Sequence, residues 1–373
     1  MIPTRFPAND IVSLVGAPPR HDLAESFGPH LPAGALLRQA ADALDELPLG
    51  YGSAAGDAAL RQAIAATHDV DPEQVVVTVG GMHALFLLAF TLCTPGDEAV
   101  VAQPVFPLAR HALLGVGAAL QPLPLRFDEG YQPDLDALRA LLTPRTRLVS
   151  LASPQNPSGV AWSADTLAAV VALVRERAPD AWLLVDETYR EASYGEAAIN
   201  RSAVHLGPRV VSVASLSKCH GAPGLRIGWA ISRDAALREA LVTAKFNTVI
   251  SCSPLDEALA LQLLRQPLAE RRAALSANLA VTADWASREA GRIEWIRPDA
   301  GALCCLRLRA GVFGDAAVER FHAALPRHGV RVGRGPWFGE SDRVFRLGFG
   351  LQTAPGLREA LQALSSALDD AAA

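Results

Sequence analysis

The chain has 373 residues, of which 50% are hydrophobic and 20% charged, a composition typical of a globular protein large enough for two hydrophobic cores. Its net charge of −5 provides no basic surface for nucleic acid or an anionic membrane. The nine histidines lack the spacing of metal ligands and the five cysteines form no C-x-x-C pair, which predicts no metal site and reduced thiols. The longest apolar run, 84–90, is too short to span a membrane, and the first residues do not resemble a signal peptide. We therefore expect a cytoplasmic protein.

Apolar strands are predicted to alternate with helices from residue 72 to about 255. The first strand ends near Val79, at a Gly-Gly turn that opens a helix reaching Phe90. Further apolar runs predict strands at 98–102, 148–151, 182–185 and 210–215, with a helix at 166–175. This alternation predicts a mostly parallel sheet with helices on both faces.

The pattern changes after Pro254. A long helical stretch from Leu255 to Arg288 is predicted, followed by strands at 293–298, 302–308 and 343–349 and helices at 316–325 and 356–368. We therefore expect a large domain over residues 46–265 and a smaller α+β domain over 266–373. The N-terminal segment 1–45 should join the small domain, and the active site should lie in the cleft between the domains.

One lysine, Lys218, stands in the segment S-L-S-K-C-H-G-A-P-G-L-R just beyond the predicted strand 210–215. Ser215 ends that strand, and Arg226 follows Lys218 behind a Gly-Ala-Pro-Gly turn. A nucleophilic lysine must lose its proton near neutral pH, and lysine pKa values fall readily on desolvation or near other cations. Hydroxyl and guanidinium groups are suitable donors to a phosphate. The segment therefore predicts a cofactor-binding lysine beside a phosphate site.

A carboxylate, Asp186, directly follows the predicted strand 182–185. Burying a carboxylate there is unfavourable unless it meets a cation, and the protonated ring nitrogen of pyridoxal phosphate (PLP) is such a cation. Tyr189, three residues later, can direct its phenol toward the ring oxygen of the same cofactor. A helix N-cap is the alternative role for Asp186. Together with Lys218 downstream, these residues predict a PLP enzyme in which Lys218 is the nucleophile.

The order of these features resembles that of the class I and II aminotransferases, which are fold type I PLP-dependent enzymes similar to aspartate aminotransferase. The resemblance extends from about Leu23 to Gly350. It includes S-P-Q-N-P-S-G at 153–159, similar to the family's N-P-x-N-P-[ST]-G, and R-V-F-R-L-G-F-G at 343–350. It implies an α/β fold with a large, mostly parallel sheet flanked by helices and a smaller α+β domain. The implied activity is transfer of the α-amino group of an amino acid to a 2-oxo acid by a ping-pong mechanism.

The resemblance also assigns a phosphate site. Backbone N–H groups at a helix start are unpaired and favour an anion, so the amides of Gly81 and Met82 are matched to the PLP phosphate. Many relatives have Ser or Thr in place of Met82, which leaves more of the binding to Ser215 and Arg226. The segment lacks the G-x-G-x-x-G pattern of a dinucleotide site.

Three further residues are matched to the cofactor ring and the substrate. Phe106, in Q-P-V-F-P, would stack on the pyridine ring. Asn156 would donate a hydrogen bond to the ring oxygen and help to position the substrate carboxylate, although Ser153 replaces the first Asn of the family pattern. Arg346 would bind the α-carboxylate through two parallel hydrogen bonds, whereas Arg343 is expected to be a solvated charge.

The segment 49–64 resembles the family's Y-x-x-x-x-G-x-x-x-L-R-x-A-I pattern, in which the tyrosine, here Tyr51, reaches the phosphate bound by the other subunit. The resemblance thus implies a homodimer with shared active sites. In the segment 22–28, Glu25 occupies a place where many relatives have small or apolar residues. Its carboxylate would select a substrate with a guanidinium or ammonium side chain, but a solvated Glu25, or one paired with Arg20 or Arg38, is an equal alternative.

Two other functions are compatible with these motifs. A lyase, cyclase or oxidase acting on an amino acid such as arginine or a derivative would use the same site, and the sequence separates these reactions poorly. A PLP-binding regulatory protein would carry an N-terminal DNA-binding extension, but only about fifty residues precede Tyr51, with no basic helix-turn-helix pattern.

Overall fold

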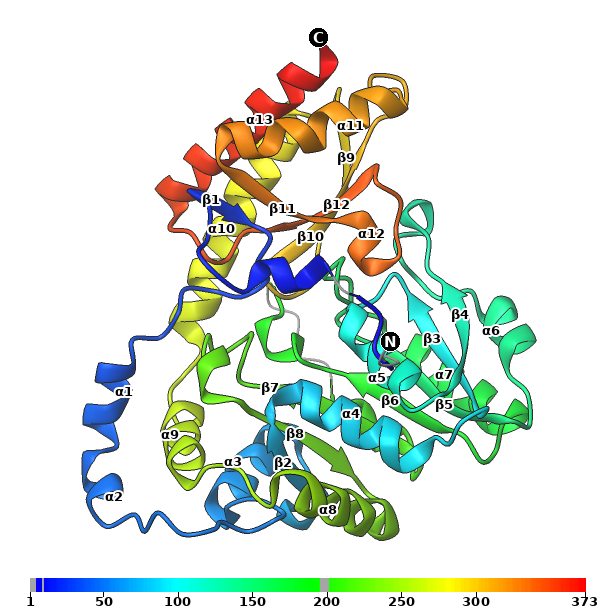
Figure 1. Ribbon diagram of the computed structural model, residues 1–373, viewed down its shortest axis with the longest axis vertical. Coiled ribbons are helices and arrows are strands. Elements are labelled where there is room, and N and C mark those ends of the chain that lie inside the picture. The colour runs from blue at the N-terminus through cyan, green and yellow to red at the C-terminus, as the bar shows by residue number, and fades with distance from the viewer. Residues whose placement is uncertain (1–4, 9, 195–200) are drawn as a thin grey trace.

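The computed structural model describes residues 5–8, 10–194 and 201–373, and shows two sheets with helices packed around them (Figure 1). The larger sheet has seven strands in the order β2-β8-β7-β6-β5-β3-β4. Its pairs are parallel except those of β8, which runs antiparallel to both β2 and β7. The strands are β2 (Val75–Val79), β3 (Glu98–Gln103), β4 (Ala119–Pro124), β5 (Thr146–Ala152), β6 (Trp182–Asp186), β7 (Val210–Ser215) and β8 (Ile227–Ser232).

Helices cover both faces of this sheet, and the alternation of side chains along each strand decides which helix they meet. On β6, Trp182 and Leu184 pack with α4, α5 and α8, whereas Leu183 and Val185 pack with α6 and α7. Helices α1, α3 and α9 cover the second face at its β2–β8 end. These helices are α1 (Ala33–Gln39), α3 (Ala58–His68), α4 (Gly80–Leu92), α5 (Pro107–Gly115), α6 (Leu135–Leu141), α7 (Ala164–Arg177), α8 (Ala235–Val249) and α9 (Pro254–Leu264).

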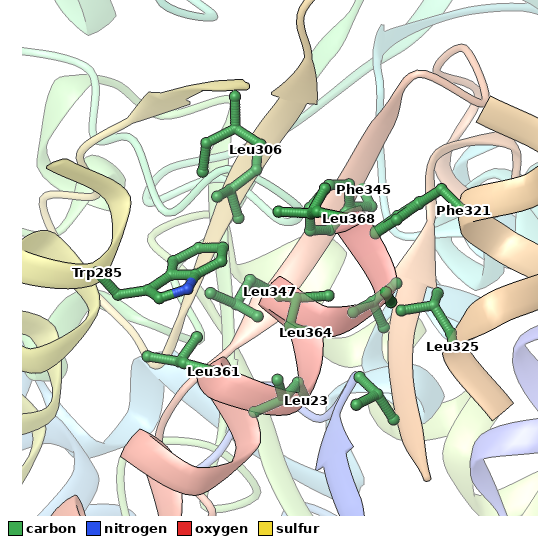
Figure 2. Close-up of a cluster of buried hydrophobic side chains, with 14 of the residues drawn as sticks. Leu23, Trp285, Leu306, Phe321, Leu325, Phe345, Leu347, Leu361, Leu364 and Leu368 are labelled. Carbon is green, nitrogen blue, oxygen red and sulfur yellow. The ribbon is translucent and has the colours of Figure 1, made fainter. Parts of the chain in front are cut away.

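The smaller sheet has five strands in the order β1-β11-β12-β10-β9. The strands are β1 (His21–Leu23), β9 (Ile293–Ile296), β10 (Leu303–Leu308), β11 (Val330–Arg334) and β12 (Val344–Gly348). Helices α10 (Ala269–Arg288), α11 (Asp315–Ala324) and α13 (Ala354–Ala372) pack against it. Figure 2 shows the resulting core, in which Leu361, Leu364 and Leu368 of α13 lie near Phe345 and Leu347 of β12. The spacing of these leucines is that of one helix face, which explains why α13 packs on the sheet.

The N-terminal segment contributes to the smaller sheet, since β1 pairs in parallel with β11. In Figure 1 this dark blue segment runs beside the smaller sheet, on the side that faces the larger one. The remaining short elements are α2 (Ala41–Asp45) and α12 (Gly335–Phe338), with 3-10 helices η1 (Asp10–Leu14), η2 (Pro72–Gln74), η3 (Phe127–Glu129), η4 (Arg190–Ala192), η5 (Ala203–Leu206), η6 (Pro223–Leu225) and η7 (Leu325–His328).

The structure corrects one predicted element. The stretch 255–288 forms two helices, α9 and α10, instead of one. Pro267 lies between them and lacks the N–H that a continuous helix needs there. The break falls next to the proposed domain boundary at residue 265. The segment 1–45, proposed to join the small domain, divides between the two sheets: β1 pairs with β11 of the smaller sheet, whereas Leu36 and Ala40 of the α1 region are buried against the larger sheet. Within the described ranges, no helix is both long and apolar enough to cross a membrane.

Candidate active site

A cavity of about 350 Å³ lies at the carboxyl ends of β5, β6 and β7, where α/β sheets commonly bind ligands. It collects predicted residues from segments far apart in the sequence. They are Gly81, Met82, Phe106, Asn156, Asp186, Tyr189, Ser215, Lys218 and Arg226.

One end of the cavity is formed by the first turn of α4 packed against Ser215 and Arg226. A Cβ atom on Gly80 would lie 2.2 Å from Nη2 of Arg226, and one on Gly81 would lie 3.6 Å from Cβ of Ser215. Only a glycine at position 80 permits this approach. Arg226 adopts a left-handed backbone with φ 51°, which costs a non-glycine residue about 1–2 kcal/mol. Helix amides, a hydroxyl and a guanidinium therefore converge, as an anion site requires.

Asp186 lies elsewhere on the wall of the same cavity. The alternation along β6 places it on the same face as Trp182 and Leu184, toward α4 and α5. Oδ1 of Asp186 accepts hydrogen bonds from Thr188, at 3.0 Å from the backbone N and 2.5 Å from Oγ1. Burial raises the pKa of Asp186, and these hydrogen bonds lower it. The carboxylate thus needs a cation to remain ionised without penalty.

Lys218 extends into the cavity from the loop after β7. Its Nζ donates a hydrogen bond to Oγ of Ser26 at 3.0 Å and lies 5.1 Å from the centroid of the Phe27 ring. Burial, with a further contribution from Arg346, lowers the pKa of Lys218 to about 8. A substantial fraction of the amine is therefore neutral near physiological pH, as a nucleophile or base must be.

A row of hydrogen bonds connects the lysine with the predicted carboxylate-binding arginine. Ser26 Oγ also accepts a hydrogen bond from Tyr189 Oη at 2.9 Å. Asn156 Nδ2 donates to Tyr189 Oη at 3.4 Å, and Arg346 Nη1 donates to Asn156 Oδ1 at 2.8 Å. Arg346 is 2% exposed, and its Nε has no hydrogen-bond partner among the described residues. A buried guanidinium with an unpaired N–H is a suitable partner for a substrate carboxylate.

A second cavity, of about 420 Å³, adjoins the first and shares Val15, Phe106, Asn156 and Lys218 with it. Its polar lining includes Glu25 and Arg346, and its apolar wall comes from Ile11, Val12, Leu14, Val15 and Leu108. In the part of the chain that the structure describes, Glu25 forms no ion pair with Arg20, Arg38 or another cation. Glu25 thus borders the second cavity without an ion-pair partner among the described residues.

Two predicted residues lie away from both cavities. Tyr51 is 86% exposed and lines neither of them, so its own chain does not bring it to the site. The expectation that Arg343 is a solvated charge was wrong. Its guanidinium is mostly covered and donates to Asp315 at 2.7 Å and to the Phe313 carbonyl oxygen, away from the cavities.

Ser26 was not selected as a site residue in the sequence analysis. It lies beside Glu25, which was selected for its charge, and a single serine provides no comparable signal. Only the packing of the N-terminal segment against β12 brings it to Lys218: a Cβ atom on Gly348 would collide with the backbone of Glu25.

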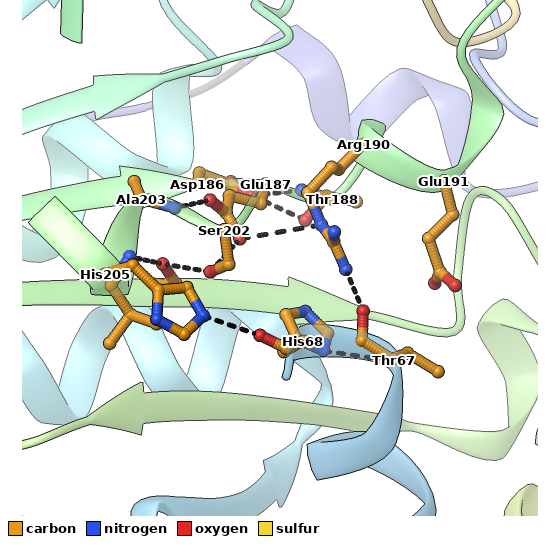
Figure 3. A network of polar contacts seen from close by, with 12 residues as sticks. Thr67, His68, Asp186, Glu187, Thr188, Arg190, Glu191, Ser202, Ala203 and His205 are labelled. Atoms are coloured by element: carbon orange, nitrogen blue, oxygen red, sulfur yellow. Dashed lines mark hydrogen bonds and ion pairs between the residues drawn. The ribbon is translucent and has the colours of Figure 1, made fainter. Parts of the chain in front are cut away.

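A buried polar network lies on the opposite face of β6 (Figure 3). Glu187 follows Asp186 and points to the other side of the sheet, where its carboxylate accepts hydrogen bonds from Ser202 Oγ at 2.8 Å and from the Ala203 N–H at 2.6 Å. Nε of Arg190 lies 3.7 Å from the same carboxylate, and its Nη2 donates to the Thr67 carbonyl oxygen at 2.9 Å. These contacts fix the turn that carries Asp186 and Tyr189.

Comparison with known proteins identifies the family. The sequence model for aminotransferases of class I and II matches residues 26–364. An arginine–pyruvate transaminase from Pseudomonas aeruginosa is 33% identical over 344 residues, which cover 87% of this chain and 84% of that protein. The chain belongs to the class I and II aminotransferases. As a member of this family, it is a fold type I enzyme that uses PLP, with amino acids and 2-oxo acids as substrates.

The chain is also similar to a synthase and a cyclase, as well as to a further aminotransferase. Capreomycidine synthase from Streptomyces vinaceus is 35% identical over 329 residues, covering 87% of this chain and 82% of the synthase. The crystal structure of a PLP-dependent cyclase, OrfR, matches with a TM-score of 0.87 at 27% identity, covering 99% of both chains. A PLP-dependent aminotransferase from Streptococcus suis matches with a TM-score of 0.85 at 26% identity, covering 94% of both.

The residues of the cavity fit the cofactor of this family. The α4 amides, Ser215 and Arg226 offer donors for a phosphate, and the buried carboxylate of Asp186 suits a protonated ring nitrogen. The partly neutral amine of Lys218 lies within the same cavity.

Proposed function

We propose that the protein transfers the α-amino group of an amino acid with a cationic side chain to a 2-oxo acid by a ping-pong mechanism. The observation that carries this proposal is the hydrogen-bonded row from Lys218 through Ser26, Tyr189 and Asn156 to Arg346. It places an amine of lowered pKa and a buried guanidinium on the two sides of one reaction space.

Bound PLP supplies an electron-withdrawing ring that stabilises negative charge at the α-carbon of an attached amino acid. Asp186 would keep the ring nitrogen protonated, and Tyr189 and Asn156 would hydrogen-bond the ring oxygen. Phe106 would cover one face of the ring. The α4 amides, Ser215 and Arg226 would hold the phosphate, as the family resemblance implies.

On the substrate side, Arg346 would bind the α-carboxylate, with Asn156 fixing the orientation of the guanidinium. Lys218 would take the proton from the α-carbon at its Nζ atom, acting as a general base. A pKa near 8 makes the amine both available and basic enough for this role.

The proposed substrate class rests on Glu25 and on the apolar wall beside it. The carboxylate would pair with a guanidinium or ammonium group, and the wall from η1 would contact the methylene stem of arginine or lysine. The similarity to an arginine–pyruvate transaminase supports this substrate class.

A panel of amino acids with pyruvate or 2-oxoglutarate tests the proposal. We expect arginine and lysine to be preferred over leucine and aspartate, and Glu25→Gln to reduce that preference roughly 10-fold or more. The exposed Glu319→Gln on α11 is the matched control and should behave as wild type. Equal rates for leucine and arginine, or an unchanged preference in Glu25→Gln, would contradict the role of Glu25.

A cyclase or lyase is the second candidate, favoured by the similarity to capreomycidine synthase and to the PLP-dependent cyclase. The two reactions differ in their need for an acceptor. A transaminase consumes a 2-oxo acid in equal amount with the amino donor, whereas a cyclase or lyase consumes the donor without one. Measuring donor loss with and without a 2-oxo acid therefore decides between them.

We also propose a homodimer in which Tyr51 completes the partner's phosphate site. Leu49 and Tyr51 are each 86% exposed, and Phe246 is 56% exposed, which favours burial against a second subunit. A cytoplasmic location is likewise proposed, since all five cysteines are buried and free.

A further inference from the structure

We propose that Ser26 is a catalytic residue: its hydroxyl oxygen holds the free amine of Lys218 on the substrate side and stabilises the protonated form of that amine. This inference rests on the proposed role of Lys218 as the base. It adds a residue outside the family motifs found in the sequence.

The geometry of Ser26 supports direct action on the reacting nitrogen. Its Oγ lies 3.0 Å from Nζ of Lys218 and 2.9 Å from Oη of Tyr189, and accepts a hydrogen bond from each. The residue is 1% exposed, yet it lines the cavity that also contains Arg346 and Glu25. A single hydroxyl therefore contacts both the base and the phenol proposed to bind the cofactor.

The charges around Lys218 explain why this contact matters. Burial, Arg346 and Arg226 lower its pKa, whereas Glu25 and Asp186 raise it, and the Tyr189 phenol faces the same hydroxyl. Ser26 Oγ accepts a hydrogen bond from the amine, and such bonds are stronger when the donor is charged. The hydroxyl thus opposes the effect of burial and keeps Lys218 basic.

This arrangement serves proton transfer in a defined way. When the neutral amine of Lys218 takes the α-proton, the C–H bond would break and an N–H bond would form on Nζ, and bound PLP would stabilise the electron pair left at the α-carbon. The new ammonium then has Ser26 Oγ as an acceptor already in place, with no rearrangement of the buried surroundings. Removing the hydroxyl leaves the ammonium short of one partner at the moment its charge forms.

The pKa of Lys218 can be measured directly in the full-length enzyme loaded with pyridoxamine phosphate, which leaves the lysine amine free. The chain has only two lysines, Lys218 and Lys245, so ¹³C-lysine labelling gives two NMR signals, and Lys218→Ala identifies the one of interest. We expect Ser26→Ala to lower the pKa of Lys218 by about one unit, since a hydrogen bond to a charged group contributes about that much. The buried Ser365→Ala in α13 is the matched control and should leave this pKa unchanged.

A second measurement connects the pKa with proton transfer. Exchange of the substrate α-proton in D₂O should depend on pH through the Lys218 titration, and its inflection should move down by the same amount in Ser26→Ala, with a slower maximum rate. If Ser26→Ala does not fold, Ser26→Gly removes the same hydroxyl and serves the same test. An unchanged Lys218 pKa in a folded variant overturns the inference. The two proposals can fail separately. If the wild type does not transfer the amino group of an amino acid to a 2-oxo acid, but Ser26→Ala still lowers the pKa of Lys218, the proposed transamination is refuted and the Ser26 contact is not.

Discussion

Lys218 can be tested as the cofactor-binding residue with few competing sites. The only other lysine, Lys245 on α8, is fully buried and lines neither cavity. We expect borohydride treatment of the yellow enzyme to abolish its visible absorbance and to fix the cofactor mass on the peptide containing Lys218. Peptide mass spectrometry is the measurement, and a label on Lys245 would refute the assignment.

The pKa of Lys218 also predicts how cofactor incorporation depends on pH. Burial lowers that pKa to about 8, and only the neutral amine is a nucleophile. The rate of covalent PLP incorporation into cofactor-free enzyme should therefore rise with pH up to about 8 and level off above it. Absorbance kinetics over a pH series measure this rate, and a rate that is constant through this range would contradict the lowered pKa.

Substitution of Asp186 tests most directly whether the cofactor ring nitrogen must be protonated. An amide at this position cannot stabilise a proton on the ring nitrogen, so Asp186→Asn should still bind some PLP but lose roughly 100-fold or more in turnover. Thr188→Val removes one hydrogen bond to the carboxylate while keeping its charge, and should lose much less. Steady-state kinetics with measured cofactor occupancy decide the point, and near-normal turnover in Asp186→Asn would show that the ring acts without its proton.

Elements that carry the site were predictable where the pattern was local. The apolar run 210–215 is β7 with the same bounds, and the run 182–185 is β6 but for one residue. Strand β11 and helix α12 were not predicted, since V-R-V-G-R and G-P-W-F are too short for a periodic signal. Ser26 reaches Lys218 only through tertiary packing of the N-terminal segment, which no local pattern encodes. Motif chemistry thus selected residues that the structure gathers in one cavity, such as Asp186 and Lys218, whereas the position of Ser26 depends on packing alone.

At the scale of elements, the turn after β6 also depends on the buried carboxylate of Glu187. Alternation sends Asp186 to the cavity and Glu187 to the buried network, where Ser202, Ala203 and Arg190 depend on its carboxylate. Glu187→Ala removes the carboxylate that accepts from Ser202 Oγ and from the buried Ala203 N–H, and should destabilise the fold by about 3 kcal/mol. Urea unfolding measures the loss. Glu176→Ala, which removes an exposed ion pair with Arg139, should change stability by less than about 1 kcal/mol. Equal stability of the two variants would contradict the structural role of Glu187.

At the scale of the whole molecule, the exposed position of Tyr51 leads to a test of whether this residue acts in the partner subunit's site or in its own. If Tyr51 completes the partner's site, a Lys218→Ala subunit and a Tyr51→Ala subunit are each inactive alone, but their hybrid dimer has one site with both groups intact. Random mixing should then restore about a quarter of wild-type activity, because half of the dimers are hybrids and each has one working site. Activity after subunit exchange, with hybrid formation verified by mass, measures this recovery.

The reciprocal mixture is a stringent control for that prediction. A subunit carrying both Lys218→Ala and Tyr51→Ala, mixed with wild type, forms hybrids in which one site lacks the lysine and the other lacks the tyrosine. If the site is shared, these hybrids are inactive and activity falls below the amount of wild-type chain present. If Tyr51 acts only within its own chain, each hybrid keeps one intact site and activity stays proportional to that amount. The ring of Tyr51 is exposed and lines neither cavity of its own chain, which leads us to expect the first result.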